Sequence, residues 1–391
     1  MPAIRSLTLG IPRSTRKEQL ESYFARLVEL ADATKSAGFE VQTTRVALER
    51  ETLSLKVPLG PPTLVVDALG DAGVDYLAWP QAVDSSTRSK HLDSLASAIR
   101  DVLWSDSRFF SSIPIAGSGN PGVDHLAIEL AARVVTLLGS SRKRALSNLQ
   151  FCSSANVPPN VPFFPAAYHV PSRERVVLSV ATQTADLAVE AAREALEGAE
   201  FTSSFVEKVT NFLERAWSAL KGNSAGDWDL TGFDLSPAPF PREDSSIGRA
   251  LELLSGEPVG RVTTCGAVAL VTTTLGNLGG GLDCVGPGFH GVMLPVLEDA
   301  VLAKRAAEGR LTLQKILLYS TLCGTGVDTL PIPGDSSNHD VACTLRALAT
   351  LSIRHSKPLT ARLMPVKGAE AGDPVDFGFE YFAPGAVVPL D

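Results

Sequence analysis

The sequence predicts an α/β protein in which a sheet with many parallel pairings is covered by helices. Short apolar runs of strand length alternate along the chain with longer segments of helical periodicity, and Gly or Pro stands at many of the boundaries. The 391 residues, 45% of them hydrophobic and 20% charged, are enough to bury a large core. Such alternation favours parallel strands joined by crossover helices.

The first half of the chain shows this alternation clearly. Residues 16–36, for example, form an amphipathic helix with Leu20, Phe24, Leu27 and Ala31 on one face. The expected strands are 4–11, 39–47, 74–79, 109–116 and 175–181. The expected helices are 16–36, 64–72, 90–103, 122–138 and 186–220, the last broken near Gly198. The Pro-rich segment 156–171 excludes a regular element.

The second half repeats the pattern after a polar connector at 221–226. The expected strands are 230–235, 292–296, 327–332 and 359–366, with a strand-like tail over 375–388. The expected helices are 247–254, 262–275, 298–307, 311–322 and 338–353. We expect a single domain, 1–391, built from two halves of about 1–220 and 227–391. The two halves are compatible with one closed barrel or with two packed lobes. In either case we expect the loops that carry polar residues to lie together at one end of the strands.

The net charge and the cysteine content indicate which binding partners and which cellular compartment to expect. The net charge is −8, and the basic run 142–144 is short, so neither nucleic acid nor an anionic membrane is an expected partner. No apolar run is long enough to span a membrane, and no secretory signal is expected. The five cysteines include no C-x-x-C pair, which favours free thiols in a reduced cytoplasm over disulfides or a structural zinc site.

A glycine-rich loop precedes the expected strand 292–296. Residues 286–291 (Gly-Pro-Gly-Phe-His-Gly) formally match G-x-G-x-x-G, but no strand leads into them and no helix follows, as the dinucleotide fingerprint requires. We therefore expect no nucleotide cofactor at this loop. The backbone N–H groups near Gly288 and Gly291 are candidates for binding an anion, and a flexible connector is the alternative.

The stretch 323–335 combines a thiol, glycines and carboxylates within an apolar frame. Its members are Cys323, Gly324, Gly326, Asp328 and Asp335. This combination is typical of a shaped site. Cys323 is the candidate nucleophile, but the helix end before it does not lower a thiol pKa, so a partner base is needed. The alternatives are a small buried hydrophobe for Cys323 and a helix N-cap for Asp335.

His290 and His169 are the candidate bases. His290 precedes the expected strand 292–296 and the acids Glu298 and Asp299 follow it, so a proton shuttle with orienting carboxylates, or a divalent-metal site, is a candidate role. Alternatively, one of these acids stabilises the N-terminus of the next helix through the helix dipole.

Two further polar positions are candidates for contact with a substrate. His169 and the neighbouring Tyr168 end an aromatic, Pro-rich run and offer a base beside a proton donor. The alternative is a packed crossover in which His169 is satisfied by a backbone carbonyl. Asp234 ends the expected strand 230–235 and is followed by a Ser-Pro turn.

Several of these segments resemble one known family. They are 163–168 (Phe-Phe-Pro-Ala-Ala-Tyr), 233–239 (Phe-Asp-Leu-Ser-Pro-Ala-Pro), 291–299 and 323–335, with the strands 6–11 and 362–366. Taken in order along nearly the whole chain, they resemble the motifs of the domain-of-unknown-function 711 (UPF0210-type) family. That family is similar in fold to the pyruvate formate-lyase type of glycyl-radical enzymes, which implies a ten-stranded α/β barrel of two five-stranded halves.

The resemblance implies a fold but no reaction. Glycyl-radical enzymes carry a C-terminal Arg-Val-x-Gly-Tyr-like loop, whereas residues 375–381 here read Val-Asp-Phe-Gly-Phe-Glu-Tyr. A radical mechanism is therefore not expected.

The leading hypothesis is a cytoplasmic enzyme that acts on a small anionic or carbonyl-bearing metabolite by non-radical thiol and acid–base chemistry, as a hydrolase, lyase or acyl transferase. The expected catalytic residues are Cys323, His290, His169, Glu298 and Asp299. The expected substrate-binding residues are Tyr168, Asp234, Gly288, Gly291, Gly324, Gly326, Asp328 and Asp335. The alternatives are a metal-dependent carboxylate enzyme and a non-catalytic ligand-binding or scaffold protein. A homo-oligomer is compatible with each.

Overall fold

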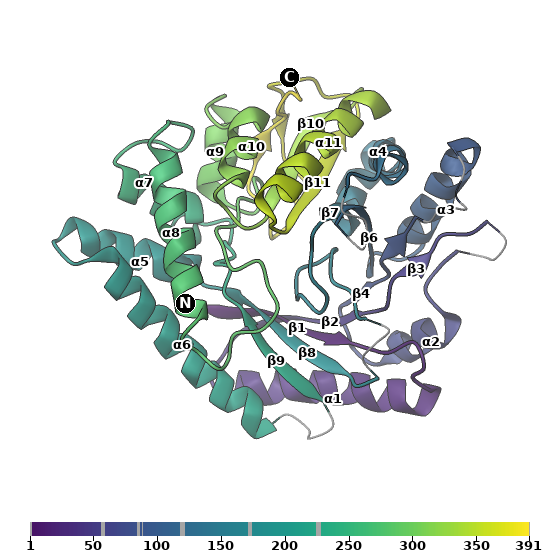
Figure 1. Cartoon of the computed structure of the whole chain (residues 1–391), viewed down its shortest axis with the longest axis horizontal. Coiled ribbons are helices and arrows are strands. Elements are labelled where there is room, and N and C mark those ends of the chain that lie inside the picture. The colour runs from purple at the N-terminus through teal and green to yellow at the C-terminus, as the bar shows by residue number, and fades with distance from the viewer. Residues whose placement is uncertain are drawn as a thin grey trace.

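Most strands belong to one large mixed sheet. The computed structural model describes residues 2–55, 59–83, 87, 89–117, 122–170, 174–223 and 228–390, with the side chains of 71, 142, 143 and 145 left out. Within these residues nine strands pair in the order β10-β11-β7-β6-β4-β2-β1-β8-β9. Figure 1 shows the strands curving around the centre of the molecule with helices on the outside.

The elements follow the alternation expected from the sequence. The strands of the large sheet are β1 (Ala3–Gly10), β2 (Val41–Ala47), β4 (Tyr76–Ala78), β6 (Phe109–Ala116), β7 (Phe151–Ala155), β8 (Val177–Gln183), β9 (Asp229–Asp234), β10 (Gly326–Pro333) and β11 (Leu359–Val366). Two small ladders pair β3 (Glu51–Thr52) with β5 (Gln81–Ala82) and β12 (Pro374–Val375) with β13 (Gly385–Ala386). The α-helices are α1 (Lys17–Ser36), α2 (Thr63–Asp71), α3 (Leu92–Ser105), α4 (His125–Leu138), α5 (Ala185–Leu196), α6 (Phe201–Asn223), α7 (Ile247–Ser255), α8 (Thr264–Gly279), α9 (Ala300–Ala307), α10 (Leu313–Ser320) and α11 (Asn338–His355).

Two parallel groups of strands run in opposite directions. β1, β2, β4, β6 and β7 pair in parallel, as do β8 with β9 and β10 with β11, whereas β1–β8 and β7–β11 are antiparallel. The carboxyl ends of the second group therefore lie beside the amino ends of the first. Along the chain, the strand direction changes between β7 and β8, which is upstream of the connector 221–226 expected to divide the two halves. Residues 224–226 of that connector lie outside the described residues.

A ten-stranded barrel is not found among the described residues. β9 and β10 do not pair with each other, and the expected strand 292–296 does not form. The segment 284–296 instead makes one isolated bridge to each of these edge strands, from Val285 to Phe233 and from Pro295 to Asp328. Because a proline has no N–H to donate, Pro287 and Pro295 limit this segment to isolated bridges.

The core confirms the expected face of α1. Leu20, Phe24, Leu27 and Ala31 are all 2% exposed or less. Burial of a large apolar side chain is worth about 1.5–3 kcal/mol relative to exposure, so this face holds α1 on the sheet. The break expected near Gly198 is also confirmed, since α5 ends at Leu196 and α6 begins at Phe201.

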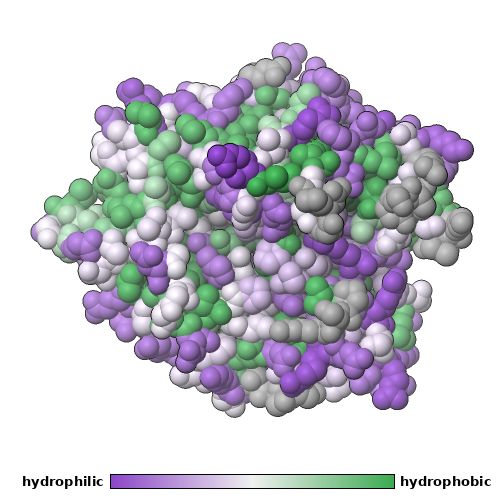
Figure 2. Space-filling model, in the orientation of Figure 1, coloured by the Kyte–Doolittle hydropathy of each residue, from purple (hydrophilic) through white to green (hydrophobic). Residues whose placement is uncertain are grey.

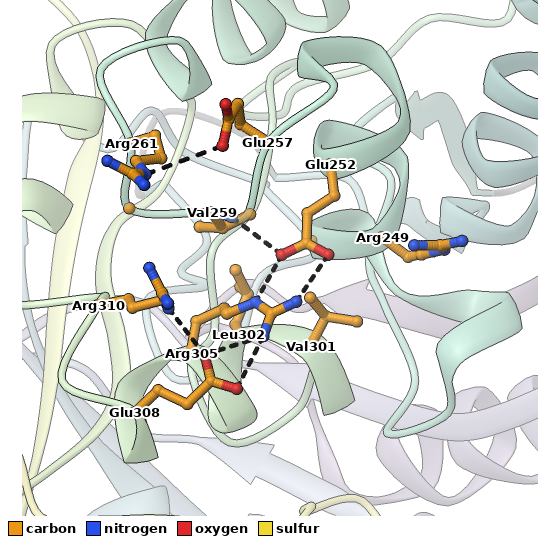
Figure 3. A network of polar contacts seen from close by, with 12 residues as sticks. Arg249, Glu252, Glu257, Val259, Arg261, Val301, Leu302, Arg305, Glu308 and Arg310 are labelled. Atoms are coloured by element: carbon orange, nitrogen blue, oxygen red, sulfur yellow. Dashed lines mark hydrogen bonds and ion pairs between the residues drawn. The ribbon is translucent and has the colours of Figure 1, made fainter. Parts of the chain in front are cut away.

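A network of ion pairs joins α7 to α9 (Figure 3). Arg305 of α9 donates to both oxygens of Glu252 of α7, at 2.7 and 3.1 Å, and to Glu308 at 2.8 and 2.9 Å. Arg310 also donates to Glu308, at 3.0 Å, and the Val259 N–H donates to Glu252 at 2.9 Å. Glu252 is only 9% exposed, so these contacts fix α9 firmly against α7.

Hydrophobic and hydrophilic residues are interspersed over the face shown in Figure 2. The exposed large hydrophobic side chains of the described residues are spread along the chain: Leu55, Leu64, Leu196, Val262, Leu270 and Leu318. No helix in the described part of the chain is long and apolar enough to cross a membrane. The homo-oligomer considered from the sequence stays a prediction.

Candidate functional site

One cleft is lined by charged side chains from strands of both parallel groups. It holds about 820 Å³ of space between its walls, including the part open to solvent. Its lining includes Arg5 of β1, Arg45 of β2, Asp328 of β10, Arg362 of β11, and Glu298, which stands just before α9. Four strands separate β1 from β11 in the sheet, so only the curvature of the sheet brings these side chains together.

Arg362 is the centre of the charged cluster. Its Nε and Nη2 donate to the two oxygens of Asp328 at 2.7 and 3.0 Å, and Nη2 also donates to Glu298 at 2.8 Å. The other oxygen of Glu298 accepts a hydrogen bond from Arg5. The side chains of Arg362 and Glu298 are 7% exposed, and that of Asp328 is 1% exposed. Since unpaired buried charges are costly, this pairing is what makes the cluster stable.

A β-bulge places Asp328 beside Arg362. The register between β10 and β11 shifts between Val327 and Leu330, so two residues of β10 stand opposite Arg362. The extra residue, Thr329, has a φ of 43°, which is rare for a β-branched side chain. Such backbone strain costs about 1–3 kcal/mol and is concentrated at functional sites. Bulges are also frequent beside active sites, where they re-aim a side chain.

Arg45 is the cation of the cleft without a carboxylate partner among the described residues. Its Nε donates to Thr43 Oγ1 at 2.8 Å, and its guanidinium lies 5.6 Å from the ring centre of Tyr76 and 5.1 Å from that of Phe164. Burial lowers the pKa of Arg45 to about 10, and the nearby Arg5 guanidinium acts in the same direction, whereas Tyr76 and the Glu298 carboxylate oppose the shift. Arg45 is therefore still cationic at neutral pH, and an anion would compensate its charge.

Asp328 is a buried carboxyl group that lines the cleft. Burial raises the pKa of Asp328 above its ordinary value; the Arg362 guanidinium opposes this shift, and the Glu298 carboxylate adds to it. A carboxyl group that exchanges its proton closer to neutral pH can act as a general acid or base.

Asp234 is another expected residue that lines the cleft. Its Oδ1 accepts from the Ser236 hydroxyl at 2.7 Å and the His290 N–H at 3.2 Å, and its Oδ2 accepts from the Phe289 N–H at 3.1 Å. A Cβ at Gly288 would lie 2.5 Å from the Asp234 carboxyl carbon, so glycine is required there. Asp234 thus anchors the glycine-rich loop to β9.

Cys323 and His290 are not joined by a hydrogen bond in the described part of the chain. Their neighbours Gly291 and Gly324 pack backbone to backbone, where a Cβ on Gly291 would lie 2.8 Å from the Gly324 nitrogen. The Cys323 side chain is 1% exposed within the main core and does not line the cleft. His290 Nδ1 accepts from the Leu235 N–H at 3.3 Å. The nucleophile and base roles of this pair stay predictions.

His169 lies at the other end of β1. A Cβ on Gly10 would lie 2.9 Å from His169 Nδ1, whereas Arg5 is five residues earlier, about 17 Å along the strand. His169 Nδ1 is 3.1 Å from Asn160 Oδ1, and the Tyr168 hydroxyl donates to a backbone carbonyl at 3.1 Å. Neither lines the charged cleft.

Asp299 and Asp335 lie outside the cleft. Asp299 is the N-cap of α9, where it accepts from the N–H groups of Val301 and Leu302 at 3.0 Å and from the Ser246 hydroxyl at 2.6 Å. The alternative helix-terminus role is therefore confirmed for this acid. Asp335 is exposed, and its alternative as the cap of α11 is wrong, since Ser337 caps that helix.

Gly324 and Gly326 allow close packing of the backbone. The Gly324 N–H donates to the Val292 carbonyl at 3.0 Å, so it already has a partner. Gly326 has a φ of 95°, and a Cβ there would lie 2.4 Å from the Thr360 carbonyl oxygen. The anion-binding role expected for these N–H groups stays a prediction.

Arg5, Arg45 and Arg362 were not among the site residues expected from the sequence. The signal available was a single arginine inside an otherwise apolar run, clearest in β11 (Leu-Thr-Ala-Arg-Leu-Met-Pro-Val), where every residue is buried. A charged residue is almost never fully buried unless it is paired, so such an arginine predicts a partner in the interior. All five cysteines are free, and the described residues contain no group of three or more His, Cys, Asp or Glu placed to hold a metal ion.

Comparison with known proteins agrees with the motifs. The family model described as "Uncharacterised ACR (DUF711)" matches residues 3–378. The chain belongs to the DUF711 family. A "UPF0210 protein" from Pyrobaculum arsenaticum is 29% identical, with 100% of this chain and 87% of the relative covered. UPF0210 proteins from Oleidesulfovibrio alaskensis and Leuconostoc mesenteroides are each 26% identical, with 96% of this chain and 88% of the relative covered. The family resemblance is thereby confirmed, and the charged cluster lies within the DUF711 match.

Proposed function

We propose that this DUF711 protein is an enzyme that binds a small metabolite with one negative charge in the cleft and moves a proton on it. The observation that carries the proposal is the unpaired Arg45. Arg5 and Arg362 form hydrogen bonds with Glu298 and Asp328, whereas the interactions of Arg45 with the described residues are a hydrogen bond to a hydroxyl group and contacts with two aromatic rings. A ligand anion is the partner that this half-buried guanidinium lacks.

Asp328 is the proposed general acid or base. Its raised pKa and its place in the lining support this role, and Arg362 fixes its orientation through two hydrogen bonds. Proton transfer belongs to hydrolase, lyase and acyl-transferase reactions alike, so the proposal covers all three. A thiol step by Cys323 would require the core around it to open, since Cys323 is buried and outside the cleft.

We also propose that segment 284–296 completes a ten-stranded barrel of the pyruvate formate-lyase type. Its bridges to β9 and β10 support this closure, because they fill the interval between the two edge strands. The Gly286 and Val296 N–H groups donate to Phe233 and Asp328 carbonyls at 3.0 and 2.9 Å. These two amides should exchange with solvent deuterium as slowly as amides of β9 and β10. Rapid exchange would contradict closure.

The binding half of the proposal is tested by thermal unfolding in acetate and in inorganic phosphate. At an anion concentration 100 times Kd, the expected stabilisation is about 2.7 kcal/mol. Arg45→Gln should abolish it. The matched control is Arg215→Gln, since Arg215 also lies over a ring, 5.6 Å from that of Phe39, but on the outer helix α6. Equal stabilisation of wild type and Arg45→Gln would refute the role of Arg45.

The catalytic half is tested by incubating the protein with a mixture of small carboxylic and phosphorylated metabolites, followed by mass spectrometry. The wild type and Arg215→Gln should consume the same compound. Asp328→Asn should slow that conversion by about 10²–10⁴-fold, the usual contribution of a general acid or base. A compound that binds in an Arg45-dependent manner but is never converted would instead favour the non-catalytic binding protein.

A further inference from the structure

Aromatic side chains are concentrated in the cleft. Six of its lining residues carry rings: Tyr76, Phe110, Phe163, Phe164, Phe379 and Tyr381. Aromatic residues make up only 6% of the chain, so this gathering distinguishes the cleft from the rest of the molecule. The rings of Tyr76, Phe110 and Phe164 form one continuous wall, with centre-to-centre distances of 4.8 and 5.7 Å between neighbours.

This aromatic wall lies against the anion-binding arginine. The Arg45 guanidinium is 5.6 Å from the ring centre of Tyr76 and 5.1 Å from that of Phe164. The N–H groups of a guanidinium lie in its plane, and a carboxylate that accepts two of them lies in the same plane. The geometry at Arg45 therefore suits a flat anionic group whose faces are covered by rings.

The shape of the ligand next to the anionic group follows from this geometry. A ring or double bond that is conjugated to a carboxylate lies in the plane of that carboxylate. It can therefore pack against the aromatic wall, in the offset or edge-to-face arrangement that aromatic rings prefer. A saturated ring is not flat, and a phosphate is tetrahedral, so neither continues the plane of the guanidinium.

The charges around Arg45 limit the anion to a single negative charge. The nearby Glu298 and Asp328 carboxylates are hydrogen-bonded by Arg5 and Arg362, and among the described residues no carboxylate lies at hydrogen-bond distance from Arg45. A second negative charge on the ligand would face these two carboxylates in a region of low dielectric constant, where like charges repel strongly.

We propose that the cleft takes a planar, conjugated monocarboxylate, whose carboxylate binds Arg45 and whose unsaturated ring or chain lies along the wall of Tyr76, Phe110 and Phe164. This assignment rests on the proposed function, since it names the substrate class of the same cleft. It excludes phosphate esters and saturated acids as preferred ligands.

Isothermal titration calorimetry of the full-length protein with four probes tests the assignment: benzoate, cyclohexanecarboxylate, acetate and inorganic phosphate. Benzoate should bind at least tenfold more tightly than each of the others. Phe164→Leu should reduce the preference for benzoate over cyclohexanecarboxylate to less than threefold. Tyr23→Leu is the matched control, since Tyr23 packs edge-to-face on Trp228 away from the cleft and should retain the preference.

The outcomes separate the two proposals. If benzoate and cyclohexanecarboxylate bind equally and both require Arg45, the planar class is wrong and the anion-binding function stands. If phosphate binds most tightly, the monocarboxylate class is wrong. If no probe binds, or if binding survives Arg45→Gln, both proposals fail. Should Phe164→Leu not fold, Tyr76→Leu replaces it, because Tyr76 belongs to the same wall and is only half-buried.

Discussion

Arg362 holds both carboxylate oxygens of Asp328, at 2.7 and 3.0 Å, across the bulge between β11 and β10. Both side chains are almost completely buried. A pair of this kind contributes little net stability compared with apolar residues of the same size, but breaking it leaves a buried charge without a partner. The strain at Thr329 and the buried charges therefore indicate a functional arrangement that the rest of the fold maintains.

Replacement of Arg362 by Met should destabilise the protein strongly. Asp328 and Glu298 would both lose a guanidinium partner in the interior, and the loss of one partner of a buried pair typically costs about 3–5 kcal/mol. Urea unfolding followed by circular dichroism measures the difference. The control is Arg100→Met, because Arg100 pairs with the exposed Asp101 and its loss should change stability by about 0.5 kcal/mol or less. Similar losses for both variants would contradict this account of the cluster.

Gly291→Ala and Gly276→Ala should change stability in opposite directions. The new methyl group of Gly291→Ala would lie 2.8 Å from the Gly324 nitrogen, so two backbone segments must separate, at a cost of about 1–3 kcal/mol. A Cβ at Gly276 in α8 would meet nothing within 4 Å, and the helix should gain about 0.4–1 kcal/mol. Thermal unfolding of the two variants provides the comparison. A Gly291→Ala variant as stable as the wild type would show that the contact between Gly291 and Gly324 is not tight.

The Glu308 carboxylate should support stability in a pH-dependent way. Hydrogen bonds from Arg305 hold the pKa of Glu308 below its usual range. A carboxyl group with a lowered pKa in the folded state stabilises the protein above its unfolded pKa of about 4.5, and this contribution disappears as the pH falls through the folded value. The stability difference between wild type and Glu308→Gln should therefore be constant above about pH 5 and shrink towards pH 3.

Chemical unfolding at several pH values between 3 and 7 measures this difference. The background variant Arg305→Gln is the control, because it removes the guanidinium that lowers the Glu308 pKa. A pH-dependent difference of the same size in the Arg305→Gln background would show that Arg310, which also donates to Glu308, accounts for the lowered pKa instead of Arg305.

The thiols should differ sharply in reactivity. Cys343 is exposed on α11, whereas Cys323 is 1% exposed in the main core. Iodoacetamide labelling of the native protein, read by peptide mass spectrometry, should modify Cys343 first and Cys323 about 100-fold more slowly, because Cys323 must wait for local opening. Fast labelling of Cys323 would show that the core opens readily there and would strengthen the nucleophile hypothesis.

The strand missed from the sequence shows why local pattern was insufficient. β7 reads Phe-Cys-Ser-Ser-Ala, which lacks the β-branched and apolar run of its neighbours, yet all five residues are buried between β6 and β11. Conversely, 292–296 reads as a strand but contains Pro295 and forms only an isolated bridge. Whether each segment forms a strand depended on the strands available to pair with it, which the sequence does not show.

The candidate site was predicted only in part for the same reason. Glu298, Asp328 and Asp234 were expected and do line one cleft: Asp234 ends β9, Asp328 lies in β10, and Glu298 stands just before α9. Three other expected residues lie elsewhere. Cys323 is in the core, His169 is at the opposite end of β1, and Asp299 caps α9. Residue type and spacing identified polar side chains in apolar surroundings without showing where each one points.

Local periodicity, the positions of Gly and Pro, and motifs contiguous in the chain were enough to predict the alternation of strands and helices, the family and most element boundaries. The folded chain alone shows that Arg5 and Arg362 bind the same Glu298 carboxylate and that, among the described residues, Arg45 has no carboxylate partner beside them. Those contacts involve strands that are far apart in the chain and have four other strands between them in the sheet, and they exist because the sheet curves.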